Sequence, residues 1–183
     1  ALGLRKFRIA SFDKESYTIQ YSKMDGTELT EFTINKTPAM PLVFYSMRDH
    51  QMAQGVWPSP NSWDLWFTQY TTLLYTDEGE PYPYIVTGVL INQRDGVQVA
   101  LDTTMDFQSI SFDIAETLNY SAIADRIGYE WKWYDFDAGS YSVLPERNYL
   151  VRTTEGYLYK LRFIGFYNQE GEKGYPTFEF QRL

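Results

Sequence analysis

The sequence predicts an all-β fold of many short antiparallel strands and hairpins, with at most one short helix. Apolar and polar residues alternate along most segments, which is the period of a strand with one buried face. Turn dipeptides such as Asp25-Gly26 and Asp95-Gly96 separate these segments. Aromatic residues, which favour strands, make up 18% of the chain. At this length one domain is expected, spanning residues 1–183.

The first half of the sequence predicts a series of strands joined by turns. The expected strands cover residues 16–21, 28–34, 41–47, 63–75, 84–92 and 97–102. Gly55, Pro58 and Pro60 mark a loop between the third and fourth of them. Pro81 and Pro83 interrupt the segment before residue 84, so we expect the fifth strand to begin there.

The C-terminal third predicts a meander of three strands over residues 149–153, 157–167 and 177–183. Glu155-Gly156 and a polar stretch over 170–174 supply the two turns. Only residues 112–127 have helix-like spacing, and Ser121 can cap a shorter helix over 122–127.

Composition excludes several classes of function. The chain has no cysteine and one histidine, His50, which excludes thiolate metal sites and cysteine nucleophiles. The net charge of -8 argues against binding nucleic acid, which needs a basic surface. No apolar run is long enough for a transmembrane segment. We therefore expect a binding protein and not an enzyme.

A few clusters invite a chemical interpretation. Pairs of acidic residues, such as Asp135 with Asp137, are the residue type of calcium or glycosidase sites, but their spacing favours solvated loop charges. His50 lies near Met47 and Met52, which are soft ligands for haem iron or copper, although a surface loop is the more ordinary interpretation. Tryptophans, including Trp57, can be core residues or platforms for flat ligands.

Taken in order, residues 61–70, 103–107, 149–163 and 167–178 resemble four segments of the HmuY-like haem-binding proteins of anaerobic Gram-negative bacteria. Residues 61–70, NSWDLWFTQY, are similar to the family's W-D-(hydrophobic)-x-F-x-x-Y strand, and residues 103–107, TTMDF, to its T-x-x-D-F segment. Residues 149–163, YLVRTTEGYLYKLRF, resemble its Y-V-V-R-T-x-x-G-x-x-Y-K-L-x-F hairpin. Residues 167–178, YNQEGEKGYPTF, resemble the family's C-terminal segment.

The resemblance implies an all-β protein in which two loops hold one haem (iron protoporphyrin IX) through an axial ligand from each loop. It further implies a cell-surface lipoprotein or a secreted hemophore that passes haem to an outer-membrane, TonB-dependent receptor. No catalysis is implied. A lipid anchor would require a cysteine upstream of Ala1.

Carried onto this sequence, the resemblance places the first iron ligand at Met105, whose thioether suits ferrous iron. The second ligand should lie within residues 131–143, a stretch without histidine or methionine, which departs from the family pattern. Tyr134 and Tyr141 are the candidates there, with Lys132 and Arg147 as the nearby cations. A haem held by Met105 alone, one that reaches His50 or Met52, and a different ligand stay open as alternatives.

Aromatic rings can add to affinity by stacking on the porphyrin, and we expect this of Phe107, Trp131, Trp133 and Tyr134. Two other classes of function are kept. A carbohydrate-binding module would use exposed tryptophans such as Trp57 or Trp133. A surface protein that binds another ligand, such as an iron chelate, would give no haem spectrum.

Overall fold

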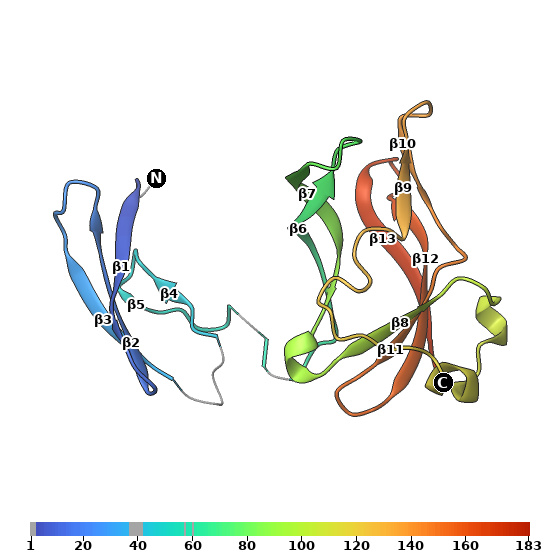
Figure 1. The fold of residues 1–183 in the computed structure, drawn as a ribbon, viewed down its shortest axis with the longest axis horizontal. Coiled ribbons are helices and arrows are strands. Elements are labelled where there is room, and N and C mark those ends of the chain that lie inside the picture. The colour runs from blue at the N-terminus through green and yellow to red at the C-terminus, as the bar shows by residue number, and fades with distance from the viewer. Residues whose placement is uncertain (1–2, 37–41, 57, 60) are drawn as a thin grey trace. The chain divides into compact units, whose positions relative to one another are not determined.

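The computed structural model describes residues 3–36, 42–56, 58–59 and 61–183 (Figure 1). The chain divides into two compact units, Ala1–Pro58 and Ser59–Leu183, called unit 1 and unit 2 below. It is 51% strand and 6% helix, which confirms the all-β prediction. The single domain predicted over residues 1–183 stays a prediction, and each unit is described by itself.

Unit 1 contains a three-stranded antiparallel sheet in the order β1-β2-β3 and a small hairpin, β4-β5. The strands are β1 (Arg5–Phe12), β2 (Ser16–Lys23), β3 (Thr30–Asn35), β4 (Tyr45–Ser46) and β5 (Gln51–Met52). The hairpin around Asp25-Gly26 is confirmed, and Gly26 adopts the positive φ of 90° that favours glycine. The strand predicted over residues 41–47 is reduced to β4, and Pro41 lies outside the described residues.

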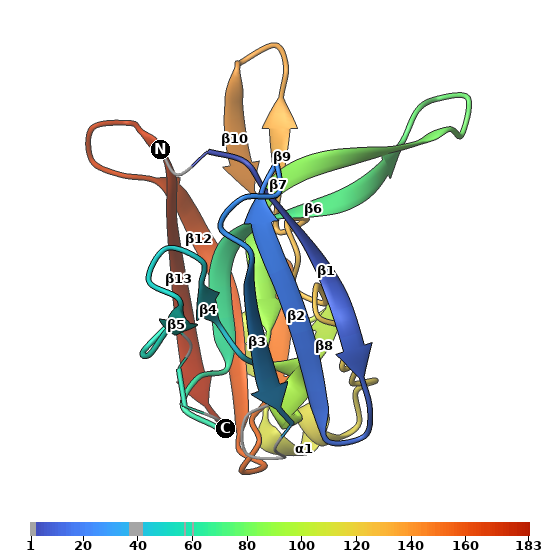
Figure 2. The ribbon, with the colours of Figure 1, turned by 90° about the vertical axis from the view of Figure 1, so that its left-hand side faces the viewer.

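Unit 2 is built on a four-stranded antiparallel sheet in the order β13-β12-β11-β8, with two further hairpins, β6-β7 and β9-β10. The strands are β6 (Leu65–Tyr75), β7 (Pro81–Ile91), β8 (Gln98–Asp102), β9 (Lys132–Asp135), β10 (Ser140–Val143), β11 (Asn148–Arg152), β12 (Leu158–Tyr167) and β13 (Lys173–Arg182). Two 3-10 turns, η1 (Gln93–Asp95) and η2 (Phe107–Ser109), and one α-helix, α1 (Phe112–Glu116), complete the described part of the unit. The β6-β7 and β9-β10 hairpins both extend beyond the four-stranded sheet (Figure 2).

The two faces of the four-stranded sheet are buried in different clusters. Because side chains alternate along a strand, Tyr149 and Val151 of β11 point to one face and Leu150 to the other. The larger cluster, cluster 1, has as its buried members Val89, Ile91, Val97, Val99, Ile127, Trp131, Tyr149, Val151, Leu161, Phe163 and Phe166. Cluster 2 has as its buried members Ala100, Ile110, Ala115, Leu150 and Leu158.

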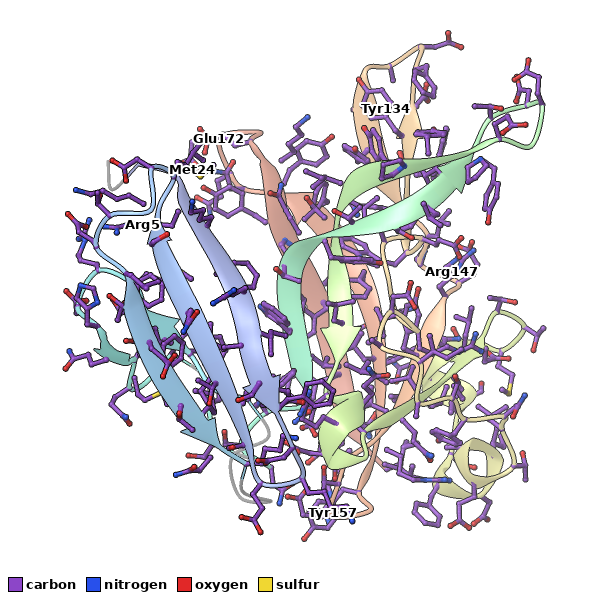
Figure 3. All side chains as sticks on the ribbon, turned by 60° about the vertical axis from the view of Figure 1, so that its left-hand side comes forward. Arg5, Met24, Tyr134, Arg147, Tyr157 and Glu172 are labelled. Atoms are coloured by element: carbon purple, nitrogen blue, oxygen red, sulfur yellow. The ribbon has the colours of Figure 1, made fainter. Side chains whose placement is uncertain are left out.

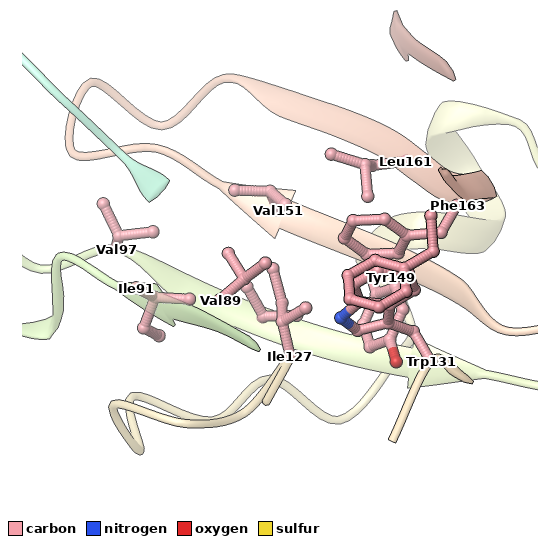
Figure 4. Packing of buried hydrophobic residues seen from close by; sticks show 11 residues of the cluster. Val89, Ile91, Val97, Ile127, Trp131, Tyr149, Val151, Leu161 and Phe163 are labelled. Carbon is pink, nitrogen blue, oxygen red and sulfur yellow. The ribbon is translucent and has the colours of Figure 1, made fainter. Parts of the chain in front are cut away.

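Cluster 1 is organised around aromatic stacking. The Trp131 ring lies on the Phe163 ring with a centroid distance of 4.0 Å and an interplanar angle of 16°, and Figure 4 shows Tyr149 beside them. Both Tyr149 and Phe163 are fully buried. This packing connects the segment before β9 to the centre of the sheet.

The predicted start of the fifth strand, at residue 84, is wrong. The prolines do not delay the fifth strand, because β7 begins at Pro81 and Pro83 pairs with Leu73 across the hairpin. The outer edge of β7 is bonded to another segment at Val89 and Ile91, in its second half. Pro81 and Pro83 lie in its first half, and at the edge of a two-stranded hairpin a missing N–H need break no ladder bond.

The predicted helix over 112–127 is shortened to α1. Ser111 caps its N-terminus by accepting a hydrogen bond from the Ile114 N–H, and the helix ends after one turn. Ser121 caps no helix, because its backbone pairs instead with Val99 of β8. The backbone of Ser121 therefore bonds to the edge strand β8, although helical spacing alone would place the residues that follow it in a helix.

Candidate functional site

Met105 lies in the loop between β8 and η2, and polar groups fix its backbone. Asp102, at the end of β8, accepts hydrogen bonds from the Met105 N–H at 3.0 Å and the Thr104 hydroxyl at 2.7 Å. Asn148, the first residue of β11, donates from Nδ2 to the Met105 carbonyl oxygen at 2.8 Å. Both backbone polar groups of Met105 therefore have a partner in the sheet.

The Asp102 side chain is nearly buried, with 7% of its surface exposed. Burial alone would raise its pKa, but hydrogen bonds from Thr104, Met105 and Asn148 outweigh burial and lower the pKa below its ordinary value. The carboxylate is thus charged at neutral pH and can hold the loop.

The Met105 side chain is partly buried and packs against cluster 2. Phe107, two residues later, is 3% exposed. Its ring is therefore buried in this structure and presents no face to a ligand. The guanidinium of Arg162 and the Nζ of Lys160 lie 4.7 and 4.9 Å from the centre of that ring. The Phe107 side chain therefore anchors the loop, and it does not offer the stacking surface for a ligand that the sequence predicted.

The β9-β10 hairpin carries both candidate tyrosines on one face. Tyr134 and Tyr141 are directly opposite each other in the register, and their ring centroids are 4.9 Å apart. Tyr141 packs edge-on against Phe166 of cluster 1, whereas Tyr134 is 37% exposed. Tyr134 therefore offers the more accessible phenol of the pair.

The two tryptophans near this hairpin differ in exposure. Trp131 is 1% exposed and belongs to cluster 1, so it has no free ring face, whereas Trp133 of β9 is 48% exposed. Of the aromatic residues predicted to stack on a ligand, Trp133 and Tyr134 keep accessible rings. Phe136, at the turn of the hairpin, is 88% exposed and was missed by the sequence analysis.

Lys132 is a buried cation at the base of the hairpin. Its Nζ donates to the Thr87 carbonyl oxygen of β7 at 2.6 Å and lies 4.4 Å from the centre of the Trp131 ring. Burial lowers the pKa of Lys132 from 10.5 to about 8. The other predicted cation, Arg147, forms an ion pair with Glu130 at 3.5 Å and lies below Tyr134 in Figure 3.

The two presumed arms of the site cover opposite faces of the sheet but leave it at the same end. Asp102 precedes the Met105 loop, and it pairs with Asn148, which begins β11. The β9-β10 hairpin joins β11 through residues 144–147, immediately before Asn148. Met105 packs on cluster 2 and Tyr141 on cluster 1. A ligand that touches both arms would therefore lie across this end of the sheet.

The alternative iron ligands His50 and Met52 lie in unit 1. His50 has a positive φ of 53°, and its Nδ1 is 2.5 Å from the Tyr21 hydroxyl oxygen. Trp57 lies outside the described residues. Among the residues that the structure describes, no three histidine or acidic side chains gather as a metal site would require.

Sequence reasoning missed two polar residues that hold the Met105 loop, Asn148 and Lys160. Both are almost fully buried, at 1% and 3% exposure, and both lie on the cluster 2 face of the sheet. For Lys160 a signal existed, because the alternation in LYKLRF places this lysine on the same strand face as the apolar Leu158.

The residue types at this end of the sheet suit a haem. A thioether and a phenol are both known axial ligands of haem iron, and Trp133 offers an exposed apolar ring. The fold and these side chains are those of an all-β protein with two arms that carry such groups. No helix in the described part of the chain has the length and apolar character needed to cross a membrane.

Comparison with known families agrees with this class. The family model described as HmuY protein matches residues 23–180, so the chain belongs to the HmuY family. That family is a family of haem-binding proteins. A search of curated proteins found no match to the chain.

Proposed function

We propose that the protein binds haem across the end of the four-stranded sheet, between the Met105 loop and the β9-β10 hairpin. The observation that carries the proposal is the family match over residues 23–180, which includes both arms. The placement of the two arms at one end of the sheet supports it. A bound haem would supply an iron centre and a large apolar ring for the protein to hold.

In this proposal Met105 would hold the haem iron from the loop after β8, and Tyr134 is the candidate ligand on the β9-β10 hairpin. The thioether of Met105 is a soft neutral donor that favours ferrous iron. Tyr134 has the more exposed phenol of the hairpin and favours ferric iron. Trp133, also exposed, adds apolar contact, since burial of such surface stabilises by about 25 cal/mol per Å².

We further propose that the protein acts as a hemophore, at the cell surface as a lipoprotein or in secreted form. It would capture haem and pass it to an outer-membrane, TonB-dependent receptor for iron acquisition. Its role would be transport and not catalysis. The test of this step is transfer of haem from the loaded protein to cells that do or do not express such a receptor.

A haem titration followed by absorbance tests the binding step, in the ferric state and after reduction with dithionite. The proteins compared are the wild type, Met105→Ala and, as a matched control, Met24→Ala. Met24 lies in the β2-β3 turn of unit 1 and is 58% exposed. We expect a saturable Soret shift in the wild type and in Met24→Ala, and an altered reduced spectrum in Met105→Ala.

The outcomes distinguish whether the protein binds haem from whether Met105 is a ligand of the haem iron. If the wild type gives no saturable shift in either redox state, the haem proposal is wrong, and binding of glycans and iron chelates becomes the next measurement. If haem binds but Met105→Ala has the wild-type spectrum, Met105 is not a ligand, and the same titration is repeated with Tyr134→Phe and Tyr141→Phe.

A further inference from the structure

Lys160 is a buried cation that no step of the proposed binding uses directly. It lies on β12, is 3% exposed, and faces cluster 2 opposite Leu150 of β11. Its Nζ donates to three backbone carbonyl oxygens, those of Phe107 at 2.9 Å, Ile110 at 3.1 Å and Gln108 at 3.5 Å. All three belong to η2 or to its C-terminal cap.

These contacts satisfy both the carbonyl oxygens of η2, which are acceptors, and the ammonium of Lys160, which is the donor. A 3-10 turn as short as η2 leaves carbonyl oxygens without partners inside the turn, and burying them unpaired is unfavourable. A lysine side chain has three N–H donors and no acceptor, so three carbonyls can occupy it completely. The Phe107 ring, with its centre 4.9 Å from Nζ, adds a favourable cation–π contact.

The other end of the same loop is held by the Asp102–Asn148 pair. Asp102 and Asn148 bind the backbone N–H and carbonyl of Met105, and Asn148 also donates to Asp102 at 3.3 Å. Asp102, Asn148 and Lys160 all lie on the cluster 2 face of the sheet. The segment from Met105 to Ile110 is thus fastened to three neighbouring strands.

We infer that Lys160 is a positioning residue, which fixes the turn after Met105 so that the Met105 arm is in place before haem arrives. This inference rests on the proposed function, since it assigns the order in which that site forms. If the Met105 loop is already ordered, it loses little conformational freedom when haem binds, and this raises the affinity for haem without any new contact. Lys160 itself touches no haem in this scheme.

Hydrogen exchange of the haem-free wild type, with all 183 residues present, is the first test and is measured residue by residue by NMR. We expect the Met105 amide to be protected before haem is added, because its N–H is bound to Asp102 at 3.0 Å. Addition of haem should change that protection little. Free exchange at Met105, with protection appearing only after haem binds, would overturn the inference.

The second test compares Lys160→Met with Leu161→Ala. Leu161 is a buried neighbour on β12 whose side chain points to cluster 1, so its variant is destabilised without losing a bond to the loop. We expect Lys160→Met to speed exchange at Met105 and Gln108 by about tenfold or more, since charge-assisted hydrogen bonds are lost. Leu161→Ala should leave the ratio of these rates to those of β11 amides unchanged.

Haem spectra complete the test and separate the two hypotheses. Lys160→Met should bind haem with a weakened thioether signature in the reduced spectrum, whereas Leu161→Ala should keep the wild-type spectrum. A wild-type spectrum in Lys160→Met would overturn the positioning role and leave haem binding intact. Absence of haem binding by the wild type would instead overturn the proposed function, while the exchange data would still show whether Lys160 holds the loop.

Discussion

The buried ammonium of Lys132 makes a quantitative prediction about stability at alkaline pH. Folding removes this group from water and surrounds it with the rings of Trp131 and Phe166, whose centres are 4.4 and 4.9 Å from Nζ. Burial lowers its pKa from 10.5 to about 8. In the unfolded chain the pKa returns to its ordinary value of about 10.4.

The sign of the effect follows from proton binding. Between about pH 8 and pH 10 the unfolded state keeps the Lys132 proton while the folded state loses it, so the unfolded state binds more protons. The contribution of Lys132 to the free energy of unfolding therefore rises with pH in this window. A difference of about 2.5 pKa units at 1.36 kcal/mol each corresponds to a rise of about 3 kcal/mol.

Urea unfolding of the wild type and of Lys132→Met, at intervals from pH 7 to pH 10, measures this contribution. Tyr70 and Tyr149 have pKa values raised to about 12 by burial, and they lower stability above about pH 10 in both proteins. The difference between the two proteins therefore isolates Lys132. If the free energy of unfolding has the same pH dependence in both, the buried ammonium is not the cause and the reasoning is refuted.

Three further predictions concern the sheet and its arms. Gly88→Ala should destabilise the protein by about 1–3 kcal/mol in thermal unfolding, because an added Cβ would lie 2.5 Å from the Gly128 carbonyl oxygen, and unchanged stability would contradict the close approach. Leu150→Ala should cost about 2–5 kcal/mol in urea unfolding, since Leu150 is fully buried in cluster 2, and a loss below that range would mean that the cluster collapses around the gap. The protection of the Met105 amide, measured as its exchange rate relative to that of an unstructured amide at the same pH, should fall as pH drops below the ordinary carboxyl pKa of about 4. The lowered pKa of Asp102 shows that its hydrogen bonds favour the carboxylate, so protonation weakens them, and Asp102→Asn should remove that pH dependence.

The strand pattern of the C-terminal meander was predictable because its turns carry strong local signals. Gly156 and Gly171 both adopt positive φ values, which glycine accepts without strain, and the strands on either side alternate clearly. β1 was not predicted, although its sequence, RKFRIASF, supplies a partner along nearly the whole of β2. Pairing in the folded state defines this strand, and seven of its eight residues are exposed, so no buried face marks it in the sequence.

The candidate site was only partly predictable, for a physical reason. Met105, Tyr134 and Trp133 follow as candidates from the resemblance and from residue chemistry, and they stay predictions. The burial of Phe107 and Trp131 depends on partners distant in sequence, such as Lys160 at 4.9 Å and Phe163 at 4.0 Å, which no local pattern reveals. Sequence periodicity marks a side chain as inward or outward on its own strand, but it does not say which layer will cover it.

The opposite orientation of neighbouring residues on β11 also protects the protein against misfolding. A shift of one residue in the pairing of β11 with β8 and β12 would turn the Asn148 amide into the apolar cluster 1 and move Tyr149 and Val151 to the other face. Such a shifted chain would bury an unpaired amide and at the same time release the Met105 carbonyl. A chain with incorrect strand pairing would therefore be unstable and unable to form the site. The register of β11 thus determines both the stability of the sheet and the formation of the site.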